Sequence, residues 1–178
     1  MKLGLKKNEV KIVDYTPEWA AEFIRVQEEL VENTGLDENR IEHIGSTAIK
    51  GMAAKPILDL IVGVDVLNQV DRELLQAFQQ TGFLRLKVER PGEIVLAKFT
   101  DDTYQEKTHF IHLVEYRGDL WNDLIYFRDY LNSNVEARTQ YLQVKLAYLE
   151  KAATGMKEYT DHKEAFVKGI IAKRTESF

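Results

Sequence analysis

The segment Ile57–Val64 constrains the fold more than any other part of the chain. It is a near-continuous apolar run in which Asp59 is the one acid, and Pro56 and Asp65 bound it. A run of this length and composition indicates a β-strand buried on both faces. Because an isolated buried carboxylate is costly, Asp59 has to be neutral, paired or metal-bound. We therefore centre the search for a functional site on Asp59.

Apolar periodicity predicts a mixed sheet followed by a helical C-terminal segment. Further short strands are expected at 9–13, 40–44, 83–89, 94–100 and 109–115. Helices are expected at 17–34, at 67–81 and from residue 119 onward, with breaks near 133–134 and 155. The expected fold class is α/β, or more closely α+β: a mixed sheet flanked by helices.

The length of the chain predicts a single domain. Its 178 residues lie within the usual range of roughly 100–200 residues for one domain. A chain of this size buries its core without disulfides or metals as staples. We expect residues 1–178 to form one domain, with the sheet and its helices in 1–134 and the C-terminal helices of 135–178 packed on them.

The charge balance limits the classes of partner. Lys and Arg number 24 against 29 Asp and Glu, a net charge of −5. Proteins that grip a nucleic-acid backbone generally carry a basic stripe, so we do not expect broad nucleic-acid binding. A local basic pocket for one small phosphorylated ligand is compatible with this charge. Residues 135–178 are mildly basic, which fits either a layer facing an anionic ligand or an ordinary solvated helix surface.

The chain contains no cysteine, which excludes disulfides, thiolate zinc sites and cysteine nucleophiles. Its basic start is not followed by the apolar run of a signal peptide. No stretch approaches the roughly 20 apolar residues of a membrane span. The sequence therefore predicts a cytoplasmic protein without a membrane partner, and it leaves the oligomeric state open.

A turn of small residues precedes the strand that contains Asp59. Gly45, Ser46 and Thr47 follow a short strand that ends at Ile44. Gly45 allows the backbone to approach a ligand closely, while Ser46 and Thr47 offer hydroxyls and would cap a short helix. Backbone N–H groups and the dipole at a helix start favour phosphate. The turn is therefore a candidate phosphate site.

A strand, a Gly-Ser turn and a second, acidic strand resemble the signature of the nucleotidyltransferase superfamily, and more specifically that of its GrpB-like family. The residues that carry this resemblance are Ile41–Ala48, Gly51, Ala54–Pro56, Asp59, Thr108-His109, His112–Val114, Phe127–Leu131, Tyr141, Lys145–Ala147, Tyr159-Thr160 and Lys163. The resemblance implies a nucleotidyltransferase-like fold. In that fold the Gly-Ser turn holds nucleotide phosphates and strand carboxylates hold divalent metals, here Mg²⁺ or Mn²⁺.

The chain departs from the superfamily in its acids. Active members usually carry two alternating acids on the second strand, and two metals clamp the attacking and leaving oxygens. Here the alternate neighbours of Asp59 are Ile57 and Ile61, because side chains two apart share a face. Glu42 and Glu115 remain as other sources of a carboxylate. Two-metal catalysis would thus depend on a single strand acid.

Three histidines are further candidates, because imidazole suits metal ligation and proton transfer near neutral pH. Structural roles are the alternative for each. His109 and His112 lie three residues apart on one predicted strand, so we expect His109 on the opposite face and His112 toward the pocket. A His43–His112–Asp59 cluster would hold one divalent metal, with Glu42 as a further ligand.

Two cations are candidates for phosphate binding. The proline after Lys55 holds that residue extended, which aims its amine at a phosphate unless it is an exposed loop lysine. Arg128 is either a bidentate phosphate donor or half of a surface salt bridge. Tyr141, Lys145 and Tyr148 form a stripe at helical spacing, which is more typical of helix packing with a solvated lysine than of a ligand face.

Three functions are compatible with these residues. The first is transfer of a nucleoside monophosphate, with the 45–47 turn, Lys55 and Arg128 on the phosphates and Asp59 as the catalytic, metal-binding residue. The second is a catalytically inactive module that binds a nucleotide or coenzyme, which the missing strand acid favours. The third is a metal-dependent phosphoester hydrolase that uses the histidines.

Overall fold

A computed structural model describes the backbone of residues 1–151 and 156–176, with side chains for 1–150 and 163–176. Its strands are β1 (Leu5–Lys6), β2 (Ile41–Ile44), β3 (Leu58–Val64), β4 (Leu84–Arg90), β5 (Glu93–Phe99) and β6 (Glu106–Glu115). They form one sheet in the order β2-β3-β6-β5-β4, and β1 pairs with the start of β6. Only the β3–β6 pair is parallel among these pairings, so the sheet is mixed as predicted.

Helices surround this sheet. They are α1 (Glu18–Thr34), α2 (Arg72–Gln80), α3 (Asp119–Ser133), α4 (Val135–Lys151) and α5 (Met156–Glu176), with short 3₁₀ turns η1 (Glu38–Arg40), η2 (Ser46–Ala48) and η3 (Leu67–Gln69). None of the helices within the described ranges combines the length and apolar character needed to cross a membrane. The mixed sheet together with these helices confirms the expected α+β class.

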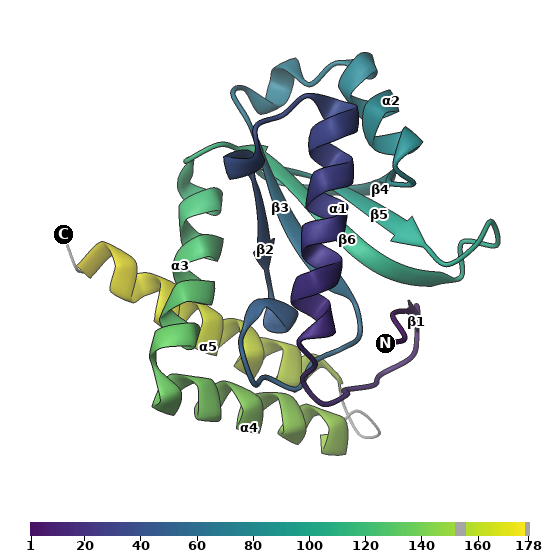
Figure 1. The fold of residues 1–178 in the computed structure, drawn as a ribbon. Coiled ribbons are helices and arrows are strands. Elements are labelled where there is room, and N and C mark those ends of the chain that lie inside the picture. The colour runs from purple at the N-terminus through teal and green to yellow at the C-terminus, as the bar shows by residue number, and fades with distance from the viewer. Residues whose placement is uncertain (152–155, 177–178) are drawn as a thin grey trace.

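One face of the sheet is covered over its central strands by α1 and α2. Figure 1 shows α1 lying across this face. Trp19 and Leu30 of α1 and Phe78 of α2 pack there against strand residues such as Leu60 and Ile111, all of which are buried. Leu60 and Ile111 belong to the alternate set of β3 and β6 side chains that excludes Asp59 and His112.

The opposite face is covered only in part. Trp121 of α3 packs on Ile44, Ile61 and Val114, which lie on β2, β3 and the end of β6. The part of this face formed by β4, β5 and the middle of β6 extends beyond α3. A half-covered sheet face leaves room for a cavity, and this is where the candidate site lies.

The C-terminal helices are joined to the sheet through the segment that follows the Gly45-Ser46 turn. Phe127 of α3, Tyr141 of α4 and Ile170 of α5 pack around Ile49 and Met52. The α3 side chain of Asn132 also bonds this segment, donating to the Ala48 carbonyl (3.0 Å) and accepting from the Lys50 N–H (2.9 Å). The turn is thereby held between the sheet and α3–α5 (Figure 1).

Most predicted elements are present, with shifted ends. The strand expected at 9–13 was wrong: β1 lies earlier, and Val13 forms one isolated bridge to Ala54. β3 pairs with β6 only from His109 onward, which leaves that edge of β6 open at Glu106 and Lys107, where β1 pairs. The helix expected at 67–81 begins at Arg72, because the Asp71 side chain caps it by accepting from the Leu74 N–H (2.8 Å). The break expected near residue 155 lies outside the described residues, as do the side chains of 159–162.

Candidate functional site

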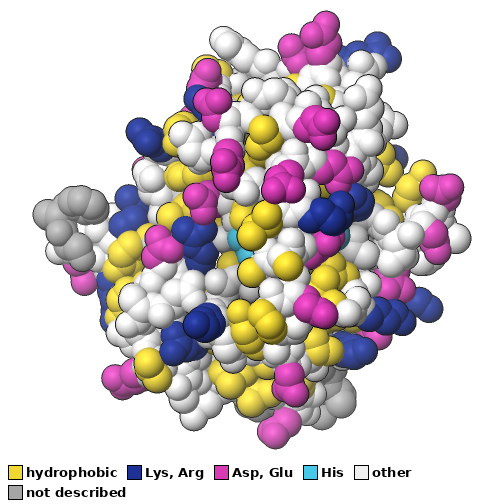
Figure 2. All heavy atoms as spheres, viewed as in Figure 1, with side chains coloured by type: hydrophobic (Ala, Val, Ile, Leu, Met, Phe, Trp, Pro, Cys, Tyr) yellow, Lys and Arg dark blue, Asp and Glu magenta, His cyan; other side chains and the backbone are white. Residues whose placement is uncertain are grey.

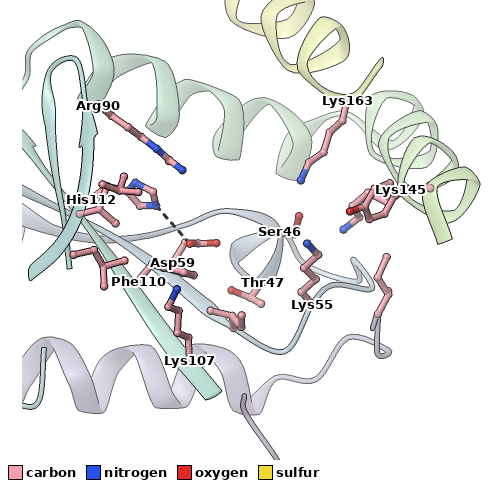
Figure 3. Close-up of a pocket in the computed structure, with 16 residues that line it drawn as sticks. Ser46, Thr47, Lys55, Asp59, Arg90, Lys107, Phe110, His112, Lys145 and Lys163 are labelled. Carbon is pink, nitrogen blue, oxygen red and sulfur yellow. Dashed lines mark ion pairs between the residues drawn. The ribbon is translucent and has the colours of Figure 1, made fainter. Parts of the chain in front are cut away.

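A cavity of about 580 Å³ opens on the partly covered face of the sheet (Figure 3). Its floor includes the apolar side chains of Leu86 and Val88 from β4, Val95 from β5 and Phe110 from β6. The far wall comes from Ser46, Thr47 and Lys55 and from the C-terminal helices. The cavity thus lies at the junction between the sheet and α4–α5. Apolar side chains of the strands form part of its floor, and charged and polar side chains form the rest of its lining.

The register of β3 and β6 decides which side chains reach the cavity. Asp59 is paired with Phe110, and His112 lies two residues further along β6, so all three point to the same face. Asp59 and His112 line the cavity, as the sequence led us to expect for His112. His109 lies on the other face, where its Nε2 is 3.1 Å from Glu22 Oε1 of α1. The predicted separation of the two histidines is therefore confirmed.

The carboxylate of Asp59 lies directly against the Gly45-Ser46 turn. A Cβ added at Gly45 would be 2.7 Å from Asp59 Oδ2. Gly45 also has φ 73° and ψ −173°, a backbone conformation that is essentially restricted to glycine. Both observations explain why no larger residue fits here.

The prediction that Ser46 and Thr47 cap a helix whose dipole favours phosphate was wrong. Ser46–Ala48 forms a single 3₁₀ turn, and no side-chain hydrogen bond caps it. A turn this short has no helix dipole to offer a phosphate. What the segment brings to the cavity is the Ser46 and Thr47 side chains, with Ser46 Oγ lying 3.5 Å from Tyr141 Oη.

His112 is held between two carboxylates. Its Nδ1 is 2.8 Å from Glu93 Oε2, and its Nε2 is 3.5 Å from Asp59 Oδ1 (Figure 3). An imidazole that faces a carboxylate with each nitrogen can donate to both only when it is doubly protonated. Burial lowers the pKa of His112, but the hydrogen bonds and charges of Asp59 and Glu93 outweigh burial and raise the pKa to about 9. His112 is therefore a cation at neutral pH.

The cavity is strongly basic. It is lined by Arg90 and by four lysines, which we call the cavity lysines: Lys55, Lys107, Lys145 and Lys163. Among the described residues none of these lysines forms an ion pair with a carboxylate. By contrast, acidic and basic side chains are interspersed on the face drawn in Figure 2. Although the chain has a net charge of −5, basic side chains are concentrated in the lining of this cavity.

Lys145 is the most deeply buried of the cavity lysines, with 5% of its surface exposed. Its Nζ donates to the Ala53 carbonyl and lies over the Tyr141 ring. Burial, aided by the charge of Lys163, lowers the pKa of Lys145 to about 7. Figure 3 shows Lys55, Lys145 and Lys163 around Ser46, while Arg90 and Lys107 lie toward Asp59. The cations therefore follow the whole length of the cavity.

Two of the predicted site residues, Arg128 and Glu42, are engaged with each other outside the cavity. Arg128 Nη1 donates to Glu42 Oε2 (2.6 Å) and to the His43 carbonyl (2.9 Å), and its Nε donates to Asp129 Oδ1 (2.9 Å). These bonds join α3 to β2, and neither Arg128 nor Glu42 lines the cavity. The structure thus favours the salt-bridge alternative for Arg128, and it does not place Glu42 beside Asp59.

The cluster expected from His43, His112 and Asp59 does not form. His43 is paired with Leu60, one residue away from Asp59, so it points to the opposite face. There its Nε2 bonds Thr47 Oγ1 (2.8 Å), its ring stacks on Phe23, and burial lowers its pKa to about 4. Within the described residues no group of three or more His, Cys, Asp or Glu side chains is arranged to hold a metal.

Several residues of the site were not assigned a role from the sequence. Glu93, which contacts His112, and the cavity residues Arg90 and Lys107 lie on strands where a charged residue looks like ordinary solvent exposure. Lys163 was named only as part of the family resemblance, without a role in binding. Lys145 was noticed as part of a helical stripe and assigned to packing. Strict alternation in β6 would place Lys107 on the covered face with His109; the register shift between β5 and β6 at Lys98 and Phe99 interrupts that alternation, so no pattern in the sequence indicated that Lys107 reaches the cavity.

The contact between Gly45 and Asp59 makes a paired prediction about stability. Gly45→Ala should be more destabilising than Gly51→Ala, although both glycines have positive φ (73° and 78°). Strain alone costs roughly 1–2 kcal/mol at each position, and Gly45→Ala adds a clash with the Asp59 carboxylate, whereas nothing lies within 4 Å of a Cβ at Gly51. Urea unfolding of the two variants measures the difference, and equal losses would contradict the described contact.

Lys145 makes a prediction about pH. The pKa of Lys145 is about 7 in the folded chain and has the ordinary value of 10.5 in the unfolded chain. Between these values the unfolded chain binds the proton more strongly, so the buried amine destabilises the folded state most below pH 7. Lys145→Met should therefore be more stable than the unchanged protein at pH 7. Its advantage should shrink toward pH 10.5 by at most about 1.4 kcal/mol per pH unit. Denaturant unfolding across this range tests the slope, and an advantage independent of pH would show that Lys145 keeps an ordinary pKa.

Comparison with known proteins places this chain in a family. The family model described as "GrpB protein" matches residues 9–173. The glutamate-rich protein GrpB of Alkalihalophilus pseudofirmus is 39% identical over 170 residues, covering 95% of this chain and 98% of that protein. The crystal structure of the conserved protein GrpB from Enterococcus faecalis has a TM-score of 0.76 at 27% identity, covering 94% of this chain and 98% of that chain.

A more distant likeness concerns the fold alone. The Cid1 poly(U) polymerase, solved with Mg and 3′-dATP bound, has a TM-score of 0.53 at 17% identity over 75% of this chain and 42% of that chain. This agrees with the nucleotidyltransferase-like fold that the Gly-Ser turn and acidic strand predicted. From the match over residues 9–173 and the likeness to GrpB proteins along nearly its whole length, we conclude that the chain belongs to the GrpB family.

Proposed function

We propose that the protein binds a nucleotide or another phosphorylated small molecule in the cavity beside Ser46 and Asp59. The observation that supports this most strongly is the gathering of the four cavity lysines, which have no carboxylate partners among the described residues. Amines of the same charge repel one another, and the lowered pKa values of Lys55 and Lys145, caused by burial and then by Lys163, reflect this cost. A multiply charged anion such as a di- or triphosphate would relieve it.

The shape of the cavity also supports a ligand with two unlike parts. Its volume of about 580 Å³ lies within the roughly 300–1,000 Å³ typical of small-molecule sites. The apolar side chains of Val88, Val95 and Phe110 would contact a base or another apolar group. The phosphates would lie along the charged and polar side chains, from His112 past Ser46 to the cavity lysines. This division suits a nucleotide or a nucleotide-containing coenzyme.

A divalent metal centre of the nucleotidyltransferase kind does not fit the donors present. Asp59 is the one carboxylate among the described residues that line the cavity. His112 lies between two carboxylates, Glu93 at Nδ1 and Asp59 at Nε2, which favours a hydrogen on each ring nitrogen and so leaves no lone pair for a metal. Mg²⁺ and Mn²⁺ are bound through carboxylates and other oxygens, and a two-metal clamp needs several of them. We therefore propose ligand binding, and not two-metal transfer of a nucleoside monophosphate.

Thermal unfolding against a panel of nucleotides and coenzymes, with Mg²⁺, with Mn²⁺ and with EDTA, tests this function. A ligand at 100 times its dissociation constant should stabilise the fold by about 2.7 kcal/mol. Lys55→Gln combined with Lys163→Gln should weaken binding at least tenfold per lysine, because each removes an ammonium from the phosphate side. Lys50→Gln is the matched control, since Lys50 is exposed and lies outside the cavity.

A panel in which no phosphorylated compound shifts the melting temperature, with or without metal, would refute the proposed function. Equal loss of affinity in the cavity variants and in the Lys50 control would mean that the lysines act through general charge and not through this site.

A further inference from the structure

The residue beside Asp59 in the cavity is a cation, at the place where a metal-binding site would need a second carboxylate. His112 lies on the strand next to Asp59 and faces the same side of the sheet. The shortest distance between their charged groups is 3.5 Å, from Nε2 to Oδ1. Asp59 is therefore already paired with a positive group.

His112 is held in this place from its other side by Glu93. Glu93 Oε2 is 2.8 Å from Nδ1, and the Glu93 side chain is only 8% exposed. Its second oxygen lies 3.3 Å from Arg90 Nη1. Glu93 thus fixes the orientation of the ring, and the two carboxylates together favour a hydrogen on each ring nitrogen.

The two contacts of His112 are unequal, because Nδ1 is hydrogen-bonded to Glu93 whereas Nε2 only faces Asp59 as an ion pair. The contact with Glu93 has an ordinary hydrogen-bond length, but 3.5 Å to Asp59 exceeds the usual 2.7–3.2 Å. The Nε2–H group is therefore loosely held, and the ring lines the cavity. A phosphate oxygen entering the cavity could accept from Nε2 without displacing Glu93.

The charges around Asp59 also oppose a divalent cation. The group formed by Asp59, Glu93, His112 and Arg90 has two negative and two positive charges, so it offers no net attraction to a metal. The cavity lysines surround it and would repel a metal ion while attracting a phosphate. The charges around Asp59 and the position of His112 therefore both oppose the binding of a divalent metal.

We propose that the His112 side chain, clamped between Asp59 and Glu93, takes the place of a divalent metal and lets the cavity bind phosphate groups without one. This inference rests on the proposed function and specifies how the site neutralises its ligand. Asp59 then orients a cationic donor, a role different from the metal ligation that its position in the fold suggests. Glu93 is a positioning residue that acts through His112.

Isothermal titration of the full chain with ATP and with inorganic tripolyphosphate, in EDTA and in Mg²⁺, tests the proposal. Both probes should bind in EDTA, and Mg²⁺ should leave the affinity unchanged or lower it by neutralising the probe. His112→Gln should weaken binding in EDTA about tenfold or more, while its unfolding midpoint without ligand stays close to that of the unchanged protein. His109→Gln is the matched control on the same strand, and it should leave the affinity unchanged because His109 lies under α1.

His112→Asp is the sharper variant. It places a second carboxylate beside Asp59, so it should lose metal-free binding and gain dependence on Mg²⁺ or Mn²⁺. In the unchanged protein, ring ¹⁵N NMR shifts provide a readout that needs no variant: His112 should have both nitrogens protonated at pH 7, whereas His109 and His43, whose pKa values burial lowers to about 4, should be neutral.

The outcomes separate this proposal from the function on which it rests. Binding seen only with Mg²⁺ or Mn²⁺, or unchanged in His112→Gln, would overturn the role of His112 and leave the phosphate site in place. A neutral His112 ring at pH 7 would overturn it equally. Failure of both probes to bind in either condition would overturn the proposed function together with this inference.

Discussion

The parallel register of β3 and β6 is the constraint on which the site depends. It sets Asp59 beside Phe110 and His112 on the face that α3 covers only in part, and it sends His109 and Leu60 to the face that α1 and α2 cover. A shift of one residue in this pairing would exchange the two sets of side chains. Packing on the apolar face thus fixes which polar residues meet in the cavity.

The arrangement carries a cost in stability that is consistent with a binding site. Lys145 is buried without a carboxylate partner among the described residues, and its depressed pKa reflects that cost. The charge of Lys163 lowers the pKa of both Lys145 and Lys55, and Figure 3 shows these three lysines around Ser46. Structural charges are usually buried with partners, so an unpaired group of this kind points to an anionic ligand.

Much of the fold follows from local patterns in the sequence. The apolar run around Asp59 predicted the central strand because a strand buried on both faces needs such composition, and period two separated His109 from His112. Asp59 was expected to be neutral, paired or metal-bound, and in the structure it is paired with His112. The strand and the faces of the two histidines could be predicted because they depend on the pattern within a single strand. The partner of Asp59 comes from the neighbouring strand, and Asp59 itself is about one-third exposed, less buried than its apolar surroundings suggested.

The errors arise where partners come from different elements. His43 was grouped with Asp59, but β2 pairs His43 with Leu60, and that register cannot be read from either strand alone. Glu93 reaches His112 from a neighbouring strand, 19 residues away in the chain. The cavity lysines come from the loop before β3, from β6, from α4 and from α5, so no local pattern could bring them together.

The central claim is that one basic cavity binds phosphate groups without a metal. Backbone NMR of the chain titrated with tripolyphosphate in EDTA tests it most directly, because it reports where the anion binds. The account predicts saturable shifts concentrated at Ser46, Lys55, Phe110 and His112, with α1 unaffected. Shifts that are absent without Mg²⁺, or that centre on exposed lysines away from the cavity, would contradict it.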